Sequence, residues 1–339
     1  MFNKLKKNRL AGYSLYILGL FYFMSIFAGF FSVYHYDDEN REFAYAPPSK
    51  IHFYDRENSS FGFFIYGAVQ SFDENYQRIY TENKDLKYKI NFFQNGRMLS
   101  VNHPARLYFW GADSRGRDIF SRALYGARVS LSVGLIGAFI SFFLGMLIGG
   151  TAGYFGGRVD TYLMRLCEVF MLAPGFYLML AIRAALPVNI SSTMAYIMII
   201  IIMSLVGWPG IARIIRGMAL SLRERDFVLA ARTQGIPAVK IIFRHIIPHT
   251  MSYALVAIAL SIPAYILGEA GLSFIGLGIQ DPDPSWGNLL SEAMNIVKIK
   301  LYPWLLAPGG LIFITVICFN LLGDALRDAF DARERASGA

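Results

Sequence analysis

The sequence predicts an all-α membrane protein with six transmembrane helices. Of its 339 residues, 55% are hydrophobic, and the mean hydropathy is +0.41, values typical of an integral membrane protein rather than a water-soluble globule. Six apolar segments are each long enough to cross the hydrocarbon core of a bilayer, which is about 30 Å thick. Arginines and lysines gather before the first segment, between the fourth and fifth, and after the sixth. This placement predicts that both termini lie in the cytoplasm.

The first span is predicted at residues 10–33. Four basic residues precede it, and they place the N-terminus in the cytoplasm: Lys4, Lys6, Lys7 and Arg9. The apolar run continues too long after this basic start to be a cleavable signal peptide. Residues 1–33 are therefore expected to form a cytoplasmic N-terminus and the first transmembrane helix.

Residues 34–128 are expected to form an extracytoplasmic insertion between the first two spans. Up to about residue 106 the chain is too polar to cross a bilayer, and its aromatic residues alternate with polar ones, which predicts a small, partly β region. A disordered linker is the alternative, and the aromatic content argues against it. At residues 109–131, FWGADSRGRDIFSRALYGARVSL has apolar residues on one helical side and arginines elsewhere, which predicts an interfacial helix.

Residues 129–326 are expected to form the transmembrane domain. Small residues recur every four positions along its first helix, residues 129–154: Gly137, Ser141, Gly145, Gly149 and Gly153. In lipid, such a row lets two helices pack backbone to backbone, so it predicts a helix–helix interface, with a conformationally loose helix as the alternative. In the next span, residues 162–185, Pro174-Gly175 predicts a kink. The fourth span, from residue 192, is expected to break at Trp208-Pro209-Gly210.

The fifth and sixth spans are predicted at residues 250–275 and 303–322, followed by a cytoplasmic tail at residues 327–339. Three ionisable residues lie within or beside spans. Glu168 and Arg183 are expected to snorkel or to pair with neighbours rather than to bind substrate, and Glu269 to pair across helices or to cap an inner cavity. Cys167 and Cys318 lie in apolar segments, where neither spacing nor setting suggests a disulfide or a metal site.

A charged, amphipathic stretch, LRERDFVLAARTQGIPAVKIIFRHIIP at residues 222–248, separates the fourth and fifth spans. Four residues share one helical face, Asp226, Leu229, Ala230 and Thr233, and Gly235 predicts the end of that helix. Pro237 fits the first turn of a second short helix. The small pair Ala230-Ala231 leaves room for another protein surface. His245 and His249 have the spacing of a metal pair but no third ligand, so no metal site is predicted.

This stretch resembles the EAA motif, the cytoplasmic loop of ABC importer permeases. The resemblance lies in Ala230-Ala231, Gly235 and the ending Ile246-Ile247-Pro248, although Leu229 stands where Glu is usual. In the family this loop is the coupling helix that docks on an ATPase subunit. The resemblance implies that role for Asp226, Ala230, Ala231, Gly235, Arg244, His245 and Pro248. An ordinary charged connection between two spans is the alternative.

Two further stretches resemble one branch of the same family. Residues 109–131 are similar to LGTDxxGRDxxSRxxYGxRxSL, a signature of the second permease of peptide and nickel importers, with Ala112 in place of the usual Thr. The arginines in this stretch are expected to be structural rather than ligand-binding. PPSKIHFYD, residues 47–55, looks like an insertion seen in one subset of these permeases. The resemblance implies the type I ABC importer permease fold.

The implied function is that of a permease subunit of an ATP-driven, binding-protein-dependent importer in the bacterial cytoplasmic membrane, carrying oligopeptides or dipeptides. The implied partners are a homologous second permease, two P-loop ATPase subunits, an extracytoplasmic substrate-binding protein and membrane lipid. Nickel complexes, peptide-like antibiotics and oligosaccharides are alternative cargoes. A stand-alone, ion-coupled secondary transporter is the alternative class, and the lack of visible internal repeats argues against it.

The sequence contains no G-x-x-x-x-G-K-[ST] motif and no nucleophile–base constellation, so no enzymatic activity and no cofactor are predicted. Energy is therefore expected to come from another subunit. The formal net charge is +8, but lysines and arginines are not gathered into one basic domain, and no nucleic-acid partner is predicted.

Overall fold

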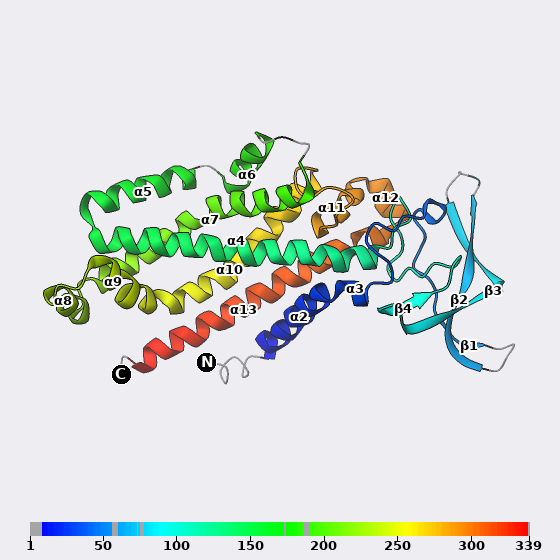
Figure 1. Ribbon diagram of the computed structural model, residues 1–339, viewed down its shortest axis with the longest axis horizontal. Coiled ribbons are helices and arrows are strands. Elements are labelled where there is room, and N and C mark those ends of the chain that lie inside the picture. Colours follow the sequence, from blue (N-terminus) through cyan, green and yellow to red (C-terminus); the bar gives the residue numbers. More distant parts are fainter. Residues whose placement is uncertain are drawn as a thin grey trace. The chain divides into compact units, whose positions relative to one another are not determined.

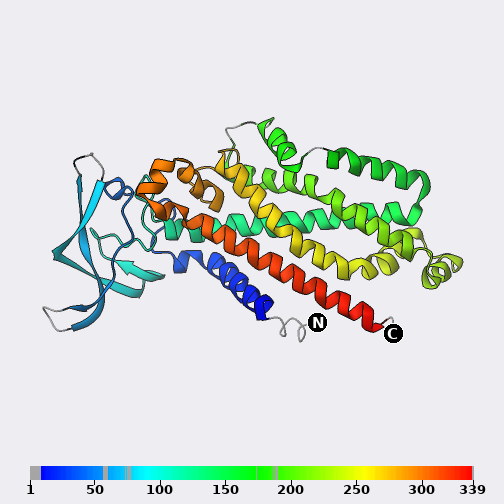
Figure 2. The same cartoon turned by 180° about the vertical axis from the view of Figure 1, so that it is seen from behind.

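The computed structural model describes residues 9–55, 60–72, 74, 78–172, 174–185, 187 and 190–337. Lys4, Lys6 and Lys7, on which the expected position of the N-terminus rests, lie outside the described residues. Within these ranges, five helices are long and apolar enough to cross a membrane, or six if the bent pair α5–α6 is one span (Figures 1 and 2). The predicted number of spans is reached only with the bent pair.

The chain divides into two compact units. Unit 1 comprises residues 1–18, 131–269 and 314–339, and unit 2 comprises residues 19–130 and 270–313. The boundaries fall within four long helices: α2 (Arg9–Ile26), α4 (Ile119–Phe155), α10 (Ile247–Phe274) and α13 (Ala307–Ser337).

Unit 2 contains the one sheet of the described chain, which confirms the predicted partly β region. Its antiparallel strands follow the order β1 (His52–Asp55), β2 (Ser60–Phe72), β3 (Arg78–Gln94) and β4 (Arg97–Val101). The turn between β3 and β4 uses Asn95 and Gly96, both with positive φ, as a tight hairpin requires. Part of one sheet face packs on the end of the first span, with Ile65 and Ile90 against Val33.

Short helices complete unit 2. After α2, the helix α3 (Ala28–Phe31) ends the first span and leads to the 3-10 turn η1 (Arg41–Phe43). Between α10 and α13 lie α11 (Trp286–Ser291), η3 (Glu292–Met294), α12 (Ile296–Leu301) and η4 (Pro303–Leu306). Ser285 caps α11 through a reciprocal capping box with Asn288, which fixes where the helix begins.

Helix α4 has no break where the sequence analysis separated an interfacial helix from the second span. It runs for 37 residues, which is about 55 Å at 1.5 Å per residue. No proline lies within it, and Arg128, at the expected boundary, donates to the carbonyls of Ser25 (2.6 Å) and Ile26 (2.9 Å). The guanidinium group of Arg128 thus has hydrogen-bond acceptors although the helix does not end there.

The predicted break at Trp208-Pro209-Gly210 is also wrong, because α7 (Ser192–Leu222) continues through Pro209. The short helix α9 (Ala238–Ile241) continues through the π turn η2 (Ile242–Ile246) into α10, past Pro248. A proline removes one helical hydrogen bond, and packing within a membrane protein commonly compensates for it. The kink at Pro174-Gly175 is confirmed, because α5 (Gly157–Leu172) and α6 (Gly175–Ala184) meet at 84°.

The row of small residues on α4 lies against α7 within unit 1. A Cβ atom added to Gly145 would lie 2.7 Å from the Cβ of Ile211, and one added to Gly149 would overlap the carbonyl of Ala212. At Gly153 the added atom would lie 2.5 Å from the Cβ of Ala219. At this end of the row, the backbones approach too closely for any side chain on α4.

The other end of the row meets α10 as well. An atom added to Gly137 would lie 2.7 Å from the ring of Tyr265. Ser141 donates to the carbonyl of Ser204 on α7 (3.0 Å) and accepts from the Tyr265 hydroxyl (2.5 Å). These buried hydrogen bonds fix α4, α7 and α10 relative to one another within unit 1.

We expect Gly149→Ala to destabilise the protein by about 1–3 kcal/mol, because the added methyl group must push α7 away. The matched control is Gly217→Ala on α7, where an added Cβ meets open space and the better helix propensity of alanine should be neutral or slightly stabilising. The measurement is the thermal unfolding midpoint in detergent. Equal midpoints for the two variants would contradict the close approach at Gly149.

Candidate functional site

The loop between α7 and α10 presents one face of a short helix to solvent. Helix α8 (Asp226–Thr233) has the predicted phase, because Asp226, Leu229, Ala230 and Thr233 are all exposed. Its opposite face is buried, with Val228 and Ala231 packed against Ile241. The interpretation of Ala231 as a contact for another protein needs correction: its side chain faces the core of this chain. Ala230 alone of the alanine pair is open to a partner.

Gly235 ends α8 in the way the sequence predicts. Its φ is +74°, in the left-handed region that glycine adopts freely, and its N–H donates to the carbonyl of Arg232 (3.0 Å). The next N–H, of Ile236, donates to the carbonyl of Ala231 (3.1 Å). Pro237 then caps α9 from outside rather than lying in its first turn.

The remaining predicted loop residues lie at the start of the long α10 segment. Arg244 and Pro248 are exposed and His245 is half-buried in the π turn, where the N–H of Ile247 bonds back to the carbonyl of Ile242. The ring of Phe227 from α8 stacks on His249, with 4.8 Å between centroids. Among the described residues, no group of three or more potential metal ligands occurs.

An ion pair secures the helices that carry this loop. Arg216 on α7 contacts both carboxylate oxygens of Asp160, at 2.9 and 2.5 Å, just after the turn in which Gly156 and Gly157 have positive φ. Two parallel N–H···O bonds fix orientation as well as distance. The start of α5 and the end of α7 are thereby held together beside the loop.

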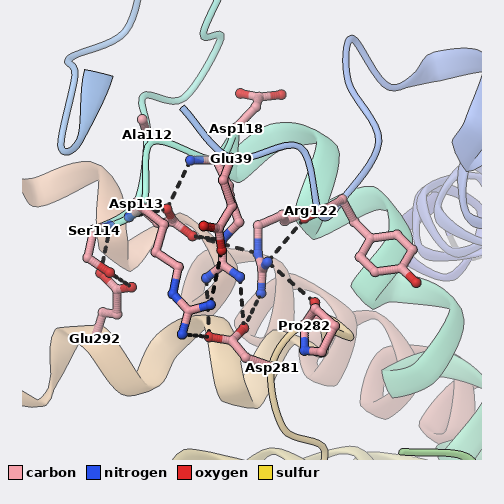
Figure 3. Close-up of polar contacts among 12 residues, drawn as sticks. Glu39, Ala112, Asp113, Ser114, Asp118, Arg122, Asp281, Pro282 and Glu292 are labelled. Atoms are coloured by element: carbon pink, nitrogen blue, oxygen red, sulfur yellow. Dashed lines mark hydrogen bonds and ion pairs between the residues drawn. The ribbon is translucent and has the colours of Figure 1, made fainter. Parts of the chain in front are cut away.

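A second constellation, in unit 2, is the arginine–aspartate cluster, defined here as Asp113, Arg117, Arg122 and Asp281 (Figure 3). Arg117 donates to Asp113 (2.6 Å) and to both carboxylate oxygens of Asp281 (3.2 Å each), and Arg122 donates to Asp281 (2.7 Å). Both guanidinium groups are buried. Burial opposes ionisation of Asp281, but Arg122 and Arg117 outweigh it and lower the pKa of that carboxyl.

Neighbouring contacts extend the cluster along the segment that precedes α4. Arg122 also donates to the carbonyls of Tyr36 (3.1 Å) and Pro282 (3.4 Å), and Ser114 donates to Glu292 (2.5 Å) (Figure 3). The loop of Asp281 is secured again by Trp286, whose ring N–H donates to the carbonyl of Ala123 (3.0 Å). These contacts hold residues 113–123 to residues 281–292, two stretches that lie far apart in the sequence.

Asp118 is a buried carboxyl beside this cluster, immediately before α4. One oxygen accepts from the N–H (2.9 Å) and hydroxyl (2.6 Å) of Ser121, and that hydroxyl oxygen accepts the N–H groups of Val33 (3.0 Å) and Tyr34 (3.1 Å). The other oxygen has no hydrogen-bond partner among the described residues. Burial raises the pKa of Asp118 to about 7.

The sequence predicts a structural part for these arginines but does not reveal Asp281 as their partner. Two arginines in an apolar setting require carboxylates, and this was the available signal. The pairing itself could not be read locally, because it joins residues more than 150 positions apart. The other ionisable residues are placed as follows: Glu168 pairs with Arg165 (2.8 Å), Arg183 is buried and donates to the carbonyl of Pro187 (3.2 Å), and Glu269 is buried.

Two family models match this chain. Residues 142–336 match the family model of the binding-protein-dependent transport system inner membrane component, and residues 1–48 match the N-terminal TM domain of oligopeptide transport permease C. A solved structure of the MetNI methionine ABC transporter in an inward-facing conformation is 16% identical, with a TM-score of 0.47; the match covers 62% of this chain and 97% of that chain.

Several relatives match at higher identity. The oligopeptide transport system permease protein OppC of Haemophilus influenzae is 40% identical, over 67% of this chain and 71% of its own length. OppC of Bacillus subtilis is 37% identical, over 68% and 74%, and the dipeptide transport system permease protein DppC of the same organism is 38% identical, over 68% and 71%. With more than half of its length matching one family model, this multi-pass membrane chain belongs to the family of inner membrane components of binding-protein-dependent ABC transport systems.

Proposed function

We propose that this chain is the second transmembrane permease of an ATP-driven importer of oligopeptides or dipeptides. The observation that carries the proposal is the exposed face of α8 in a chain of this family. The opposite, buried face of α8 packs against the start of a continuous 37-residue helical segment. The relatives named above are permeases of oligopeptide and dipeptide transport systems, which favours peptides as cargo.

The proposed complex contains a homologous second permease, two P-loop ATPase subunits and an extracytoplasmic substrate-binding protein. Membership in a binding-protein-dependent family supports the last two kinds of partner. The complex would lie in a bacterial cytoplasmic membrane with both termini of this chain and the loop at residues 222–248 in the cytoplasm. The basic residues of the loop support that orientation.

In the proposed mechanism, ATP binding closes the ATPase subunits, and their motion displaces α8. Val228 and Ala231 transmit this displacement to Ile241, because buried contacts cannot slide without losing packing. The pair Arg216–Asp160 carries it to α5 and α7. The pathway between the two permeases then opens on the opposite side, as in other rigid-body transitions.

The arginine–aspartate cluster has a supporting part in this proposal. It keeps the loop around Asp281 attached to the segment that begins α4, so that the extracytoplasmic ends of the spans in unit 2 stay together during transport. Removing one partner would leave a buried, unpaired charge, which costs several kcal/mol.

The cargo is tested by measuring the ATPase rate of the purified complex with its binding protein loaded with di-, tri- and longer peptides, nickel complexes or oligosaccharides. Stimulation by peptides above the unloaded binding protein supports the proposal. Stimulation by another cargo class alone would replace peptides, and a chain that transports without ATPase subunits would be a secondary transporter.

We expect Ala230→Glu to abolish transport while leaving the membrane level of the permease normal. The side chain is exposed in the free chain, but docking would bury an unpaired carboxylate at a cost of several kcal/mol. Transport and the retention of ATPase subunits on purification are the measurements. Lys240→Gln is the control, an exposed charge elsewhere in the same loop, and it should leave both unchanged. Normal transport by the Ala230→Glu variant with its ATPases bound would exclude this face as the docking surface.

The expected topology is tested with single cysteines at exposed positions in a variant that lacks Cys167 and Cys318. Asn95→Cys, in the turn after β3, should react with a membrane-impermeant maleimide from outside the cell, and Thr233→Cys only after the membrane is opened. Labelling of both from one side would contradict the orientation.

We expect the free energy of unfolding to fall as pH rises from 4 to 7 through the contribution of Asp118. Its pKa is about 7 when folded and about 4 when unfolded, so the folded state binds the extra proton, and the loss is on the order of 4 kcal/mol. Asp118→Asn stays neutral and should flatten this dependence in thermal unfolding between pH 5 and 8. Asp85→Asn, an exposed control, should not. An unchanged pH profile in Asp118→Asn would show that this carboxyl does not titrate in the window.

A further inference from the structure

Three phenylalanines form an exposed row across the sheet of unit 2. The ring of Phe53 on β1 contacts that of Phe63 on β2, with 5.0 Å between centroids, and Phe63 contacts Phe92 on β3 at 5.4 Å, both edge to face. Their exposed fractions are 60%, 43% and 49%. Phe61, also on β2, is 87% exposed. These four residues are called the phenylalanine ledge below.

The ledge continues a buried apolar surface. Strand residues alternate between faces, and Ile65 and Ile90, which share the face of Phe63 and Phe92, are buried against the end of the first span. The opposite face is more polar: Lys87 lies 4.1 Å from the centroid of the Phe64 ring, and His52 contacts Glu82 (3.4 Å). The sheet is therefore amphipathic, with part of its apolar face unpacked. Contiguous exposed apolar groups of this kind mark contact with a protein or with a membrane.

Ring contacts also lead from the neighbouring residue of β3 to the first span. Phe93, next to Phe92, contacts Phe30 at 6.2 Å, and Phe30 contacts Phe31 at 5.2 Å, in the helix that ends the first span. Phe31 in turn contacts Phe23 at 5.8 Å, a half-exposed residue of α2. Helix α2 lies in the segment that matches a transmembrane domain model. Figures 1 and 2 show α3 ending beside β4. These contacts hold the end of β3, one residue from Phe92, against the end of the first span.

We propose that the phenylalanine ledge rests in the interfacial layer of the bilayer and binds lipid, as the apolar face of an interfacial amphipathic helix does. Phe30 lies in the last turn before the chain leaves the first span, which puts Phe93 at the depth of the interface. Phenylalanine offers no hydrogen-bonding group to a protein partner and loses little by contacting acyl chains. The ledge therefore contacts lipid, and the extracytoplasmic region is attached to the membrane through β1, β2 and β3 as well as through the first span.

The test is electron paramagnetic resonance of the full chain in the assembled complex, in lipid nanodiscs. A nitroxide label is attached at Phe61→Cys and, in a second variant, at Phe53→Cys, with Cys167 and Cys318 replaced by alanine. Collision rates with oxygen, which concentrates in lipid, and with a water-soluble nickel chelate are measured at each position. Lys89→Cys is the matched control, because Lys89 is an exposed residue of β3 that pairs with Phe64, on the opposite face of the sheet from the ledge.

At both ledge positions we expect a several-fold higher ratio of oxygen to nickel collisions than at Lys89. High nickel collision rates equal to those at Lys89 would mean that the ledge lies in water and would overturn the proposal. Low collision rates with both reagents would mean that a protein covers the ledge, which would overturn it equally. The two ledge variants act as checks on each other, since a local disturbance of one strand would change only one of them.

Discussion

The arrangement of unit 1 depends on the close contact between the backbones of α4 and α7. No side chain larger than hydrogen fits on α4 at Gly145, Gly149 or Gly153, so α7 can take only a narrow range of positions. That position brings Arg216 to Asp160 and sets the end of α7 from which the loop departs. The orientation of α8 depends on this arrangement, because α8 follows directly after α7. The placement of the exposed face at Ala230, the proposed docking surface, therefore depends on glycines more than 75 residues earlier in the chain.

The loop at residues 222–248 and the arginine–aspartate cluster accommodate charge near a membrane in different ways. The loop keeps most of its charges exposed and buries apolar contacts beneath α8. Unit 2 buries two guanidinium groups and supplies carboxylates for them, one from the same segment and one from a distant loop. The first arrangement leaves a surface free for a partner, and the second ties chain to chain. This difference follows the chemistry, because separating a buried charge from its partner is costly, whereas a solvated charge needs no partner.

Features that depend on local backbone chemistry could be predicted from the sequence. Gly235 ends α8, Pro174-Gly175 bends the third span, and the phase of α8 follows its apolar spacing. The expected break at Pro209 is absent because packing compensates for the missing N–H, which no local pattern reveals. Helical phase also separates two faces without saying which one is inside, so Ala231 was assigned to the wrong side. Asp281 was missed because its partners lie far away in sequence.

The π turn at Ile242–Ile246 determines how the loop is rotated about the axis of α10. A π turn holds one residue more than an α turn, and each residue of an α-helix advances about 100° around the axis. Were these five residues to relax into an α-helical turn, α9 and the loop attached to it would turn by that angle relative to α10. The segment can thus act as a rotary joint between loop and span, with Pro248 fixing where the joint lies, because the carbonyl four residues earlier has no N–H to accept.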